Sequence, residues 1–406
     1  MDSTSTDPRS RDAFDPAGAR VLVSLNVEDA VRNRYTRAAR TPEPDLCCPT
    51  EYDGRLLEIV PPEILERDYG CGDPSRHIGP GETVLDLGSG AGKICYIAAQ
   101  IVGREGRVIG VDANEEMLAL ARRHQAEFAR RIGYANVEFR KGRIQDVQLD
   151  LDRLDEHLAE RPVRTSSDWL RVEEHARGLR ATAPLVADAS IDVVVSNCVL
   201  NLVRPADRPQ LFAGMHRVLK RGGRAVVSDI VADEDVPGHL QQDPELWSGC
   251  LSGAFREDRL VEAFEEAGFY GCEIVARQAE PWAVIEGIEF RSVTVRAWKG
   301  KDGPCLDRRQ AVIYRGPWKA VIDDDGHTLV RGQRMAVCDK TFQIYTRPPY
   351  AAQIIAVPPL APVPLAEAEP FSCRGTPVRS PRETKAGPLP VLRLPAGECC
   401  GPSECC

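Results

Sequence analysis

The chain has 406 residues with a formal net charge of −9, so it can bury a large core and is expected to hold more than one domain. The acidic balance disfavours nucleic acid as the main partner. No run of 18 apolar residues occurs, and the polar start Met1–Asp7 lacks a signal-peptide core, so we expect neither a membrane partner nor export. In a cytoplasmic protein the 14 cysteines are then expected to be thiols rather than a disulfide framework.

The N-terminal part is expected to lead into a turn that carries a cysteine. Residues 1–25 are rich in Ser, Thr, Asp and Arg and are expected to be disordered. Region 26–75 begins with a predicted helix, continues into a loop at Cys47 and Cys48, and ends with a turn in which glycines flank Cys71. That turn places one thiol directly before the first predicted strand.

A glycine-rich turn follows this first strand, Thr83–Leu87, and precedes an apolar helix. It contains Asp86, Gly88, Gly90 and Gly92 in the spacing D-x-G-x-G-x-G. Glycines allow the backbone to turn tightly and to approach a ligand where a Cβ would collide. The sequence therefore predicts a ligand-binding turn at a strand end.

The next predicted strand, Arg107–Asp112, ends on an acid that can bind both ribose hydroxyls of a nucleoside cofactor. A dinucleotide site and an S-adenosylmethionine (SAM) site share this geometry. The dinucleotide spacing G-x-G-x-x-G is absent, and Asp86 before the first glycine suits the ammonium of the amino-acid end of SAM. We therefore predict SAM.

The predicted core, 76–232, alternates strands and helices and is expected to be an α/β, Rossmann-like, doubly wound sheet. In the loop 142–146 we expect Ile144 to stack on the adenine and Gln145 or Asp146 to lie near its amine. The stretch 149–184 is much longer than compact α/β connections and suits an inserted helical subdomain. Cys198 follows a buried strand, at the sheet edge where such folds bind ligands.

Three C-terminal regions follow the core. Region 233–300 contains Cys250 and is expected to supply two more strands of the sheet. Region 301–350 is expected to form a small β-rich module. Region 351–406 is expected to be extended, because 13 of the 31 prolines fall between Pro348 and Pro402. It ends in four cysteines that could collect metalloid, relay redox equivalents or have no kinetic role, namely Cys399, Cys400, Cys405 and Cys406.

The thiols Cys71, Cys198 and Cys250 need a chemical explanation. Structural zinc sites favour paired cysteine knuckles, and these three are widely separated, so a soft thiophilic centre fits them better. Three thiolates could hold trivalent arsenic as a pyramid with its lone pair free. Because the thiolate is the ligand, binding must release protons or the thiol pKa values must be lowered.

Four blocks resemble the arsenite SAM methyltransferase family: Tyr69-Gly-Cys71-Gly, Val84-Leu-Asp-Leu-Gly-Ser-Gly-Ala-Gly, Val195-Ser-Asn-Cys198-Val-Leu-Asn-Leu and Leu246-Trp-Ser-Gly-Cys250-Leu-Ser-Gly-Ala. The resemblance runs from Val27 to Pro348 and implies a class I SAM methyltransferase fold. It implies that Cys71, Cys198 and Cys250 bind arsenic, and that Cys47 or Cys48 acts early in turnover. The expected cofactor-binding residues are Tyr69, Asp86, Gly88, Ser89, Gly90, Gly92, Asp112, Ala113, Met117, Ile144, Gln145 and Asn197. The insert 149–184 departs from the family pattern.

The resemblance further implies that arsenite or its thiol adducts, and then methylarsenite, are methylated by a monomer. A thiol reductant, glutathione or a thioredoxin- or glutaredoxin-type protein, would restore any disulfide. Two alternatives stay open: a SAM methyltransferase acting on another acceptor, and a non-enzymatic metalloid-binding protein. The first predicts that Cys198→Ser keeps activity, and the second predicts arsenite binding without methylated product.

Overall fold

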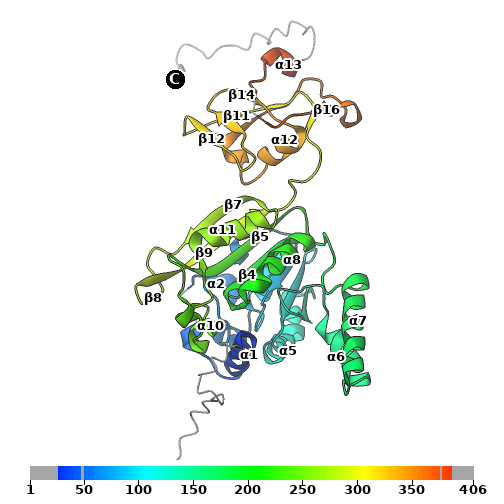
Figure 1. Cartoon of the computed structure of the whole chain (residues 1–406), viewed down its shortest axis with the longest axis vertical. Coiled ribbons are helices and arrows are strands. Elements are labelled where there is room, and N and C mark those ends of the chain that lie inside the picture. Colours follow the sequence, from blue (N-terminus) through cyan, green and yellow to red (C-terminus); the bar gives the residue numbers. More distant parts are fainter. Residues whose placement is uncertain (1–25, 47–49, 375–376, 386–406) are drawn as a thin grey trace, which may run out of the picture. The chain divides into compact units, whose positions relative to one another are not determined.

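The computed structural model describes residues 26–46, 50–374 and 377–385. The chain divides into two compact units, which meet in the sequence between Lys299 and Gly300 (Figure 1). The predictions for residues 1–25, for Cys47 and Cys48, and for the four terminal cysteines lie outside the described residues.

The first unit is built on one mixed sheet of spatial order β3-β2-β1-β4-β5-β9-β7. The strands from β3 to β5 run parallel to one another. Strand β9 pairs antiparallel with β5, and β7 pairs antiparallel with β9. Short strands β6 and β8 pair with β5 and β9. This is the predicted class I SAM methyltransferase fold. The strands are β1 (Thr83–Leu87), β2 (Arg107–Asp112), β3 (Val137–Lys141), β4 (Ile191–Asn197), β5 (Leu219–Ala232), β6 (Phe255–Arg256), β7 (Tyr270–Arg277), β8 (Ala283–Ile285) and β9 (Ile288–Trp298).

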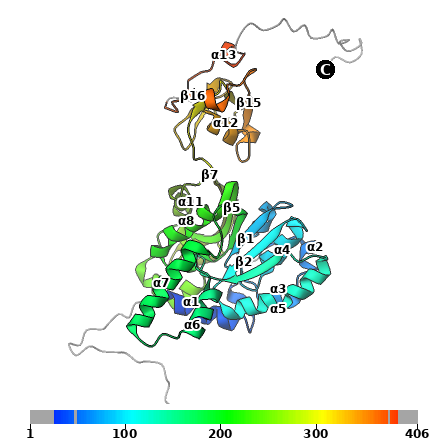
Figure 2. The same ribbon diagram turned by 90° about the vertical axis from the view of Figure 1, so that its right-hand side faces the viewer.

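Helices cover both faces of this sheet (Figure 2). Successive side chains of a strand point to opposite faces, so Val84 packs in the core on the α4 and α5 side while Leu85 packs on the α8 and α11 side. None of the helices among the described residues is long and apolar enough to cross a bilayer. The helices are α1 (Val27–Ala38), α2 (Gly54–Leu57), α3 (Pro62–Glu66), α4 (Lys93–Val102), α5 (Glu115–Ile132), α6 (Leu151–Glu160), α7 (Ser166–Thr182), α8 (Arg208–Val218), α9 (Gly238–Gln241), α10 (Pro244–Ser248) and α11 (Glu257–Glu266).

The insert 149–184 forms the two helices α6 and α7, which stand beside the core in Figure 1. Thr165 and Asp168 form a capping box that fixes the start of α7. The His157 and His175 rings, one from each helix, stack with centroids 3.9 Å apart. The helical reading of this insert is therefore confirmed.

The second unit is a small β-rich module, as expected, with its own core around β11. A three-stranded sheet has the order β14-β11-β15, and two short ribbons pair β10 with β16 and β12 with β13. Its elements are β10 (Leu306–Asp307), β11 (Ala311–Tyr314), β12 (Ala320–Ile322), β13 (Thr328–Val330), β14 (Arg334–Ala336), α12 (Asp339–Tyr345), β15 (Ile354–Val357), β16 (Glu369–Pro370) and α13 (Pro381–Lys385).

The expectation that the chain is extended and unpacked from residue 351 is wrong over residues 351–374 and 377–385. Strand β15 pairs with β11 over four residues, and β16 pairs with β10. The prolines do not prevent this pairing, because Pro358 and Pro359 come directly after β15, which is an edge strand. Proline density is therefore a poor guide to the end of this unit.

Arg379 fixes the last described segment to the start of the unit, which suggests a direct test. Its buried guanidinium binds both carboxylate oxygens of Asp307, at 2.8 and 3.1 Å. Because Asp307 is partly exposed, we expect Arg379→Ala to destabilise the unit by about 1–3 kcal/mol. Hydrogen exchange of the β11 and β15 amides measures the loss. The exposed Arg382→Ala is the matched control, and equal behaviour of the two variants would contradict a structural role for this segment.

Candidate active site

A cavity of about 330 Å³ lies at the carboxyl ends of β1, β2 and β4, a size suited to a small-molecule ligand. Of the predicted cofactor residues, Gly92 and Asp146, the alternative to Gln145, are absent from its wall; Asp146 instead pairs with Arg180 of α7 at 2.8 Å. Gly92 instead precedes α4 with φ 93°, and a Cβ there would lie 2.8 Å from Cζ of Phe139. The predicted residues that line the cavity are Tyr69, Asp86, Gly88, Ser89, Gly90, Asp112, Ala113, Met117, Ile144, Gln145 and Asn197.

Asp112 holds the glycine turn in place from the neighbouring strand. One carboxylate oxygen accepts from the backbone N–H of Gly90 at 2.9 Å, and the other accepts from that of Asn114 at 2.8 Å. Burial raises the pKa of Asp112, and these backbone bonds oppose the rise. Each oxygen keeps a further lone pair, so the carboxylate can still accept from ribose hydroxyls. The position fits a nucleoside cofactor.

Asp86 is a buried acid in the cavity wall, 2 % exposed. The thiol of Cys95, which sequence reasoning missed, donates to its Oδ2 at 3.2 Å. Burial is the main reason that the pKa of Asp86 rises to about 7. A buried carboxylate without a countercharge is costly, so a ligand ammonium in this cavity would be bound favourably.

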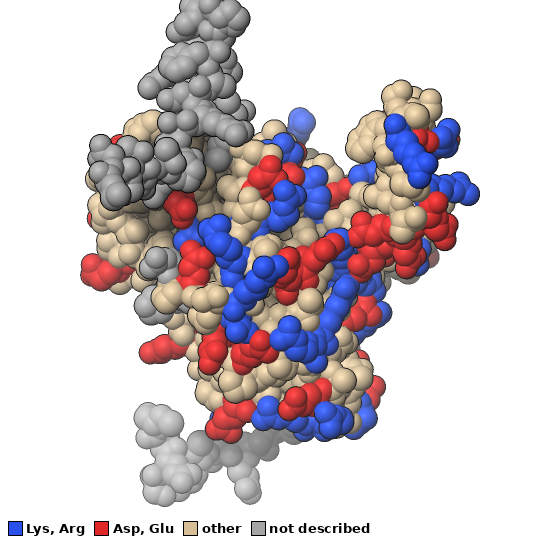
Figure 3. All heavy atoms as spheres, turned by 90° about the horizontal axis from the view of Figure 1, so that it is seen from below, with Lys and Arg blue, Asp and Glu red and all other residues tan. Residues whose placement is uncertain are grey.

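Helix α1 covers part of the cavity through charged residues that sequence reasoning also missed. Glu28 forms ion pairs with Arg143, after β3, and with Arg204, after β4; the Arg204 pair measures 3.2 Å. All three residues line the cavity. On the face seen in Figure 3, acidic and basic side chains are interspersed. No motif in the sequence indicates these pairs, because they join segments far apart in the chain.

The predicted arsenic-binding thiols Cys71, Cys198 and Cys250 come together in one cluster and are all buried. Sulfur atoms of Cys71 and Cys198 lie within 4.8 Å of each other and of the Asp229 carboxylate. The Cys250 thiol donates to the carbonyl of Cys198 at 2.9 Å. Contacts with the Cys250 and Cys71 thiols, together with burial, raise the pKa of Cys198, and burial raises that of Cys71. The thiols of Cys71 and Cys198 therefore favour their protonated forms in this environment.

Two of these cysteines adopt a backbone conformation that non-glycine residues usually avoid. Cys198 has φ 62° and Cys250 has φ 64°. Such residues cost about 1–3 kcal/mol each and persist where the surrounding structure holds them. Here the holding groups are buried: Asp229 accepts from the Leu200 N–H at 2.8 Å, and the Asn201 amide donates to the carbonyl of Cys250 at 3.1 Å. Strain concentrated at two thiols is typical of a functional site.

Asn197 holds the loop that carries Cys71 through hydrogen bonds to its backbone. Its Oδ1 accepts from the backbone N–H groups of Cys71 and Gly72, at 3.0 and 3.2 Å, and its Nδ2 donates to the Gly72 carbonyl at 2.8 Å. A Cβ on Gly70 would lie 2.4 Å from that Nδ2, which explains the glycine there. Although Asn197 lines the cavity, its amide bonds the cysteine loop and, at 3.3 Å, the Tyr52 hydroxyl.

The thiols lie beside the cavity rather than in its wall. Asn197, Val199 and Tyr35 line the cavity, and the three cysteines do not. Burial and the adjoining Cys250 and Cys198 thiols raise the pKa of Tyr35, whose phenol therefore lies between cavity and thiols. Tyr35 was not singled out from sequence, where it reads only as a core position of the N-terminal helix.

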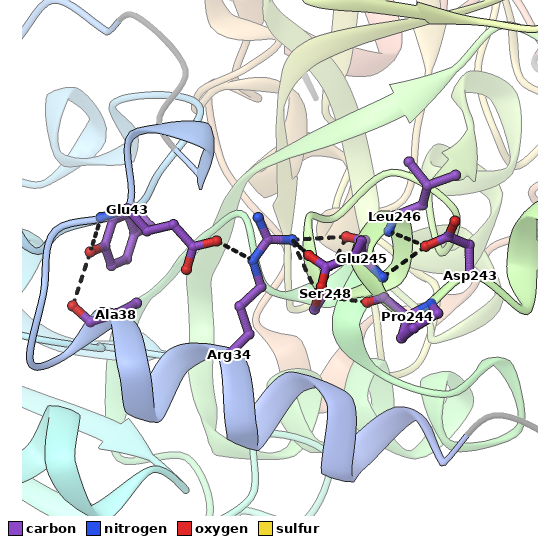
Figure 4. Close-up of polar contacts among 9 residues, drawn as sticks. Arg34, Ala38, Glu43, Asp243, Pro244, Glu245, Leu246 and Ser248 are labelled. Atoms are coloured by element: carbon purple, nitrogen blue, oxygen red, sulfur yellow. Dashed lines mark hydrogen bonds and ion pairs between the residues drawn. The ribbon is translucent and has the colours of Figure 1, made fainter. Parts of the chain in front are cut away.

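Arg34 joins α1 to the segment that carries Cys250 (Figure 4). Its buried guanidinium donates to Glu43 at 2.7 Å, to the Glu245 carbonyl at 2.8 Å and to Ser248 Oγ at 3.2 Å. Helix α10 ends at Ser248, two residues before Cys250. Arg34 thus fixes the helix that leads into the strained cysteine.

Asp86 predicts a pH dependence of cofactor binding. With its pKa near 7 in the free protein, the carboxyl is largely protonated below that pH, while a bound ammonium stabilises the ionised form. Binding a ligand ammonium therefore releases a proton at low pH, and we expect SAM affinity to rise between pH 6 and pH 8. Calorimetry in buffers of different ionisation enthalpy measures both affinity and proton release. Asp86→Asn should bind weakly and without this pH dependence; an unchanged profile would contradict the assignment.

The Arg34 contacts predict a local loosening. We expect Arg34→Ala to cost about 1–3 kcal/mol, since it leaves buried acceptors unpaired while Glu43 keeps partial solvation. Hydrogen exchange at residues 246–252 should accelerate, and arsenite affinity should fall. The exposed Arg37→Ala, one turn further along α1, is the control. If both variants exchange alike, Arg34 does not position the Cys250 segment.

Comparison with known proteins agrees with this geometry. A methyltransferase-domain family model matches residues 78–177 and 172–268, and a model of a domain of unknown function matches 301–388. An arsenite methyltransferase of Aquipseudomonas alcaligenes is 34% identical over 71% of this chain and 77% of its own, and that of Homo sapiens is 29% identical over 74% of each chain. The crystal structure of an arsenic(III) SAM methyltransferase from Chlamydomonas reinhardtii matches with a TM-score of 0.52 and 25% identity, covering 80% of this chain and all of that one. The chain therefore belongs to the arsenite methyltransferase family.

Proposed function

We propose that this protein transfers methyl groups from SAM to trivalent arsenic bound by Cys71, Cys198 and Cys250, giving mono-, di- and trimethylated products. The observation that carries the proposal is the buried three-thiol cluster beside a nucleoside-sized cavity; Leu202 packs against the cluster and also lines the cavity. No histidine is among the described residues that line this cavity.

The cavity residues fit SAM. Asp112 would bind the ribose hydroxyls, Asp86 the ammonium, and Ile144 the adenine face, and all three line the cavity. SAM supplies an electrophilic methyl group on a sulfonium centre. Helix α1 and the Glu28 ion pairs would exclude water from it.

The raised thiol pKa values favour arsenous acid over a dication as the ligand. Arsenous acid and three thiols form three As–S bonds, and each thiol proton leaves on a displaced hydroxide as water, so no net charge is buried. A dication such as Zn²⁺ would need three thiolates in a site where burial penalises charge. A glutathione adduct of arsenite would exchange in the same balanced way, releasing glutathione thiols.

The site needs no general base, because the arsenic lone pair carries the nucleophilic electrons. Its contribution is positioning, which supplies roughly 7–11 kcal/mol when two reactants are held in reacting geometry. Asn197, Asn201 and Arg34 provide it by fixing the three cysteine-bearing segments. Use of the lone pair would break the methyl–sulfonium bond of SAM, release S-adenosylhomocysteine and leave pentavalent arsenic. Two thiols would return the two electrons by forming a disulfide, which a thioredoxin-, glutaredoxin- or glutathione-type reductant would restore. We infer that the protein acts as a cytoplasmic monomer.

The cluster geometry predicts a division of labour among the thiols. Cys198 and Cys250 follow strands β4 and β5 and are joined by the bond from the Cys250 thiol to the Cys198 carbonyl, whereas Cys71 lies in a loop before the sheet and its thiol contacts Cys198. Methylarsenite has only two exchangeable positions on arsenic. We expect Cys71→Ser, which keeps the backbone bonds to Asn197, to abolish methylation of arsenite and to spare that of methylarsenite.

Purified protein, SAM, thiol and each arsenical, with the arsenic species separated over time, provide the measurement. Cys272→Ser, a half-buried cysteine of β7 in the same unit, is the control. Loss of both activities in Cys71→Ser would contradict the division of labour. Formation of no methylated arsenic by the native protein would instead favour a non-enzymatic metalloid binder or another acceptor.

A further inference from the structure

The second unit contains a thiol cluster of its own. Ligand atoms of Cys305, Cys338 and Cys373 all lie within 4.8 Å of one another. They come from three distant parts of the unit, yet they meet in one place. None of them was assigned a role from the sequence, because their spacing matches no metal-binding motif.

Backbone pairing brings two of these cysteines together. Strands β10 and β16 are antiparallel, with Leu306 opposite Pro370, and the ribbon continues with the Phe371 N–H donating to the Cys305 carbonyl at 2.8 Å. Cys373 follows two residues later. The ribbon therefore fixes Cys305 and Cys373 as near neighbours, independently of any ligand.

The third cysteine, Cys338, is held by side-chain contacts at the start of α12. Gln310 Nε2 donates to the Val337 carbonyl at 2.8 Å, and Cys338 Sγ lies 3.1 Å from Thr341 Oγ1. Cys338 is fully buried, whereas Cys305 and Cys373 are half-buried. The cluster thus has one inner thiol and two thiols that a ligand can reach.

The local electrostatics differ from those at the first cluster. Although burial alone would raise it, the pKa of Cys305 is lowered by hydrogen bonds from the Cys373 and Cys338 thiols and by the Lys340 ammonium. Lys340 Nζ also donates to the Gly303 carbonyl at 3.1 Å, which holds it on this side of the cluster.

We propose that Cys305, Cys338 and Cys373 form a second binding site for trivalent arsenic. The group contains sulfur ligands only, which select thiophilic ions. Structural zinc takes four ligands, and among the described residues this group offers three, the number that a pyramidal As(III) centre takes. Arsenous acid and three thiols give three As–S bonds and three waters, so no oxidant, reductant or net charge is required.

The test is the arsenite stoichiometry of the full chain in which Cys399, Cys400, Cys405 and Cys406 are changed to serine, which removes the terminal thiols. We expect two tightly bound equivalents, each with three As–S bonds by arsenic X-ray absorption. Adding Cys305→Ser or Cys373→Ser should remove one equivalent, and adding Cys272→Ser should remove none. The two half-buried positions are chosen because serine at the buried Cys338 could disturb folding.

Two results would overturn the second site: a single equivalent in the four-serine chain, or equal losses from Cys305→Ser and Cys272→Ser. Zinc that copurifies with the four-serine chain, is lost in Cys305→Ser and resists displacement by arsenite would show a zinc site instead. Arsenite methylation by Cys305→Ser should stay close to the native rate. This readout separates failure of the second site from failure of the proposed catalytic site, which depends on Cys71.

Discussion

The geometry of the first unit depends on two buried asparagine amides at the end of β4. Asn197 binds the loop of Cys71, and Asn201 binds the carbonyls of Ile230 and Cys250. An unpaired buried polar group costs about 1–3 kcal/mol, and the amide Nδ2 groups of both residues are paired here. These bonds therefore oblige three distant segments to meet at one sheet edge. The strained conformations of Cys198 and Cys250 are stable only because this network holds them.

The network explains why the cofactor cavity and the thiols are neighbours without being continuous. Asn197 lines the cavity and contacts the cysteine loop, so one side chain belongs to both sites. Tyr35 of α1 lines the cavity and also adjoins the Cys250 and Cys198 thiols. Arg34 fixes α1 to the segment that carries Cys250, so a displacement of this helix would shift both the cavity wall and that segment. Helix α1 therefore contacts both the cavity and the segment that carries Cys250.

The two thiol clusters lie in different surroundings. In the first unit, burial raises the pKa of Cys71, and contacts with the Cys250 and Cys71 thiols, together with burial, raise that of Cys198. In the second unit, Lys340 favours ionisation of a half-buried Cys305. The first cluster is enclosed, whereas two of the three thiols of the second cluster are half-buried.

The sequence by itself determined the elements whose signal is local. The glycine turn after β1, the acid that ends β2 and the buried strand before Cys198 follow from spacing and periodicity, and the family blocks indicated the three thiols. Contacts between distant segments were decided only by the tertiary structure. Cys95 beneath Asp86, Arg34 beside Ser248, and the meeting of Cys305, Cys338 and Cys373 leave no periodic trace. The second unit shows the same limit: its prolines suggested an extended tail, but pairing of β15 with β11 decided otherwise, because an edge strand needs hydrogen bonds on one side only.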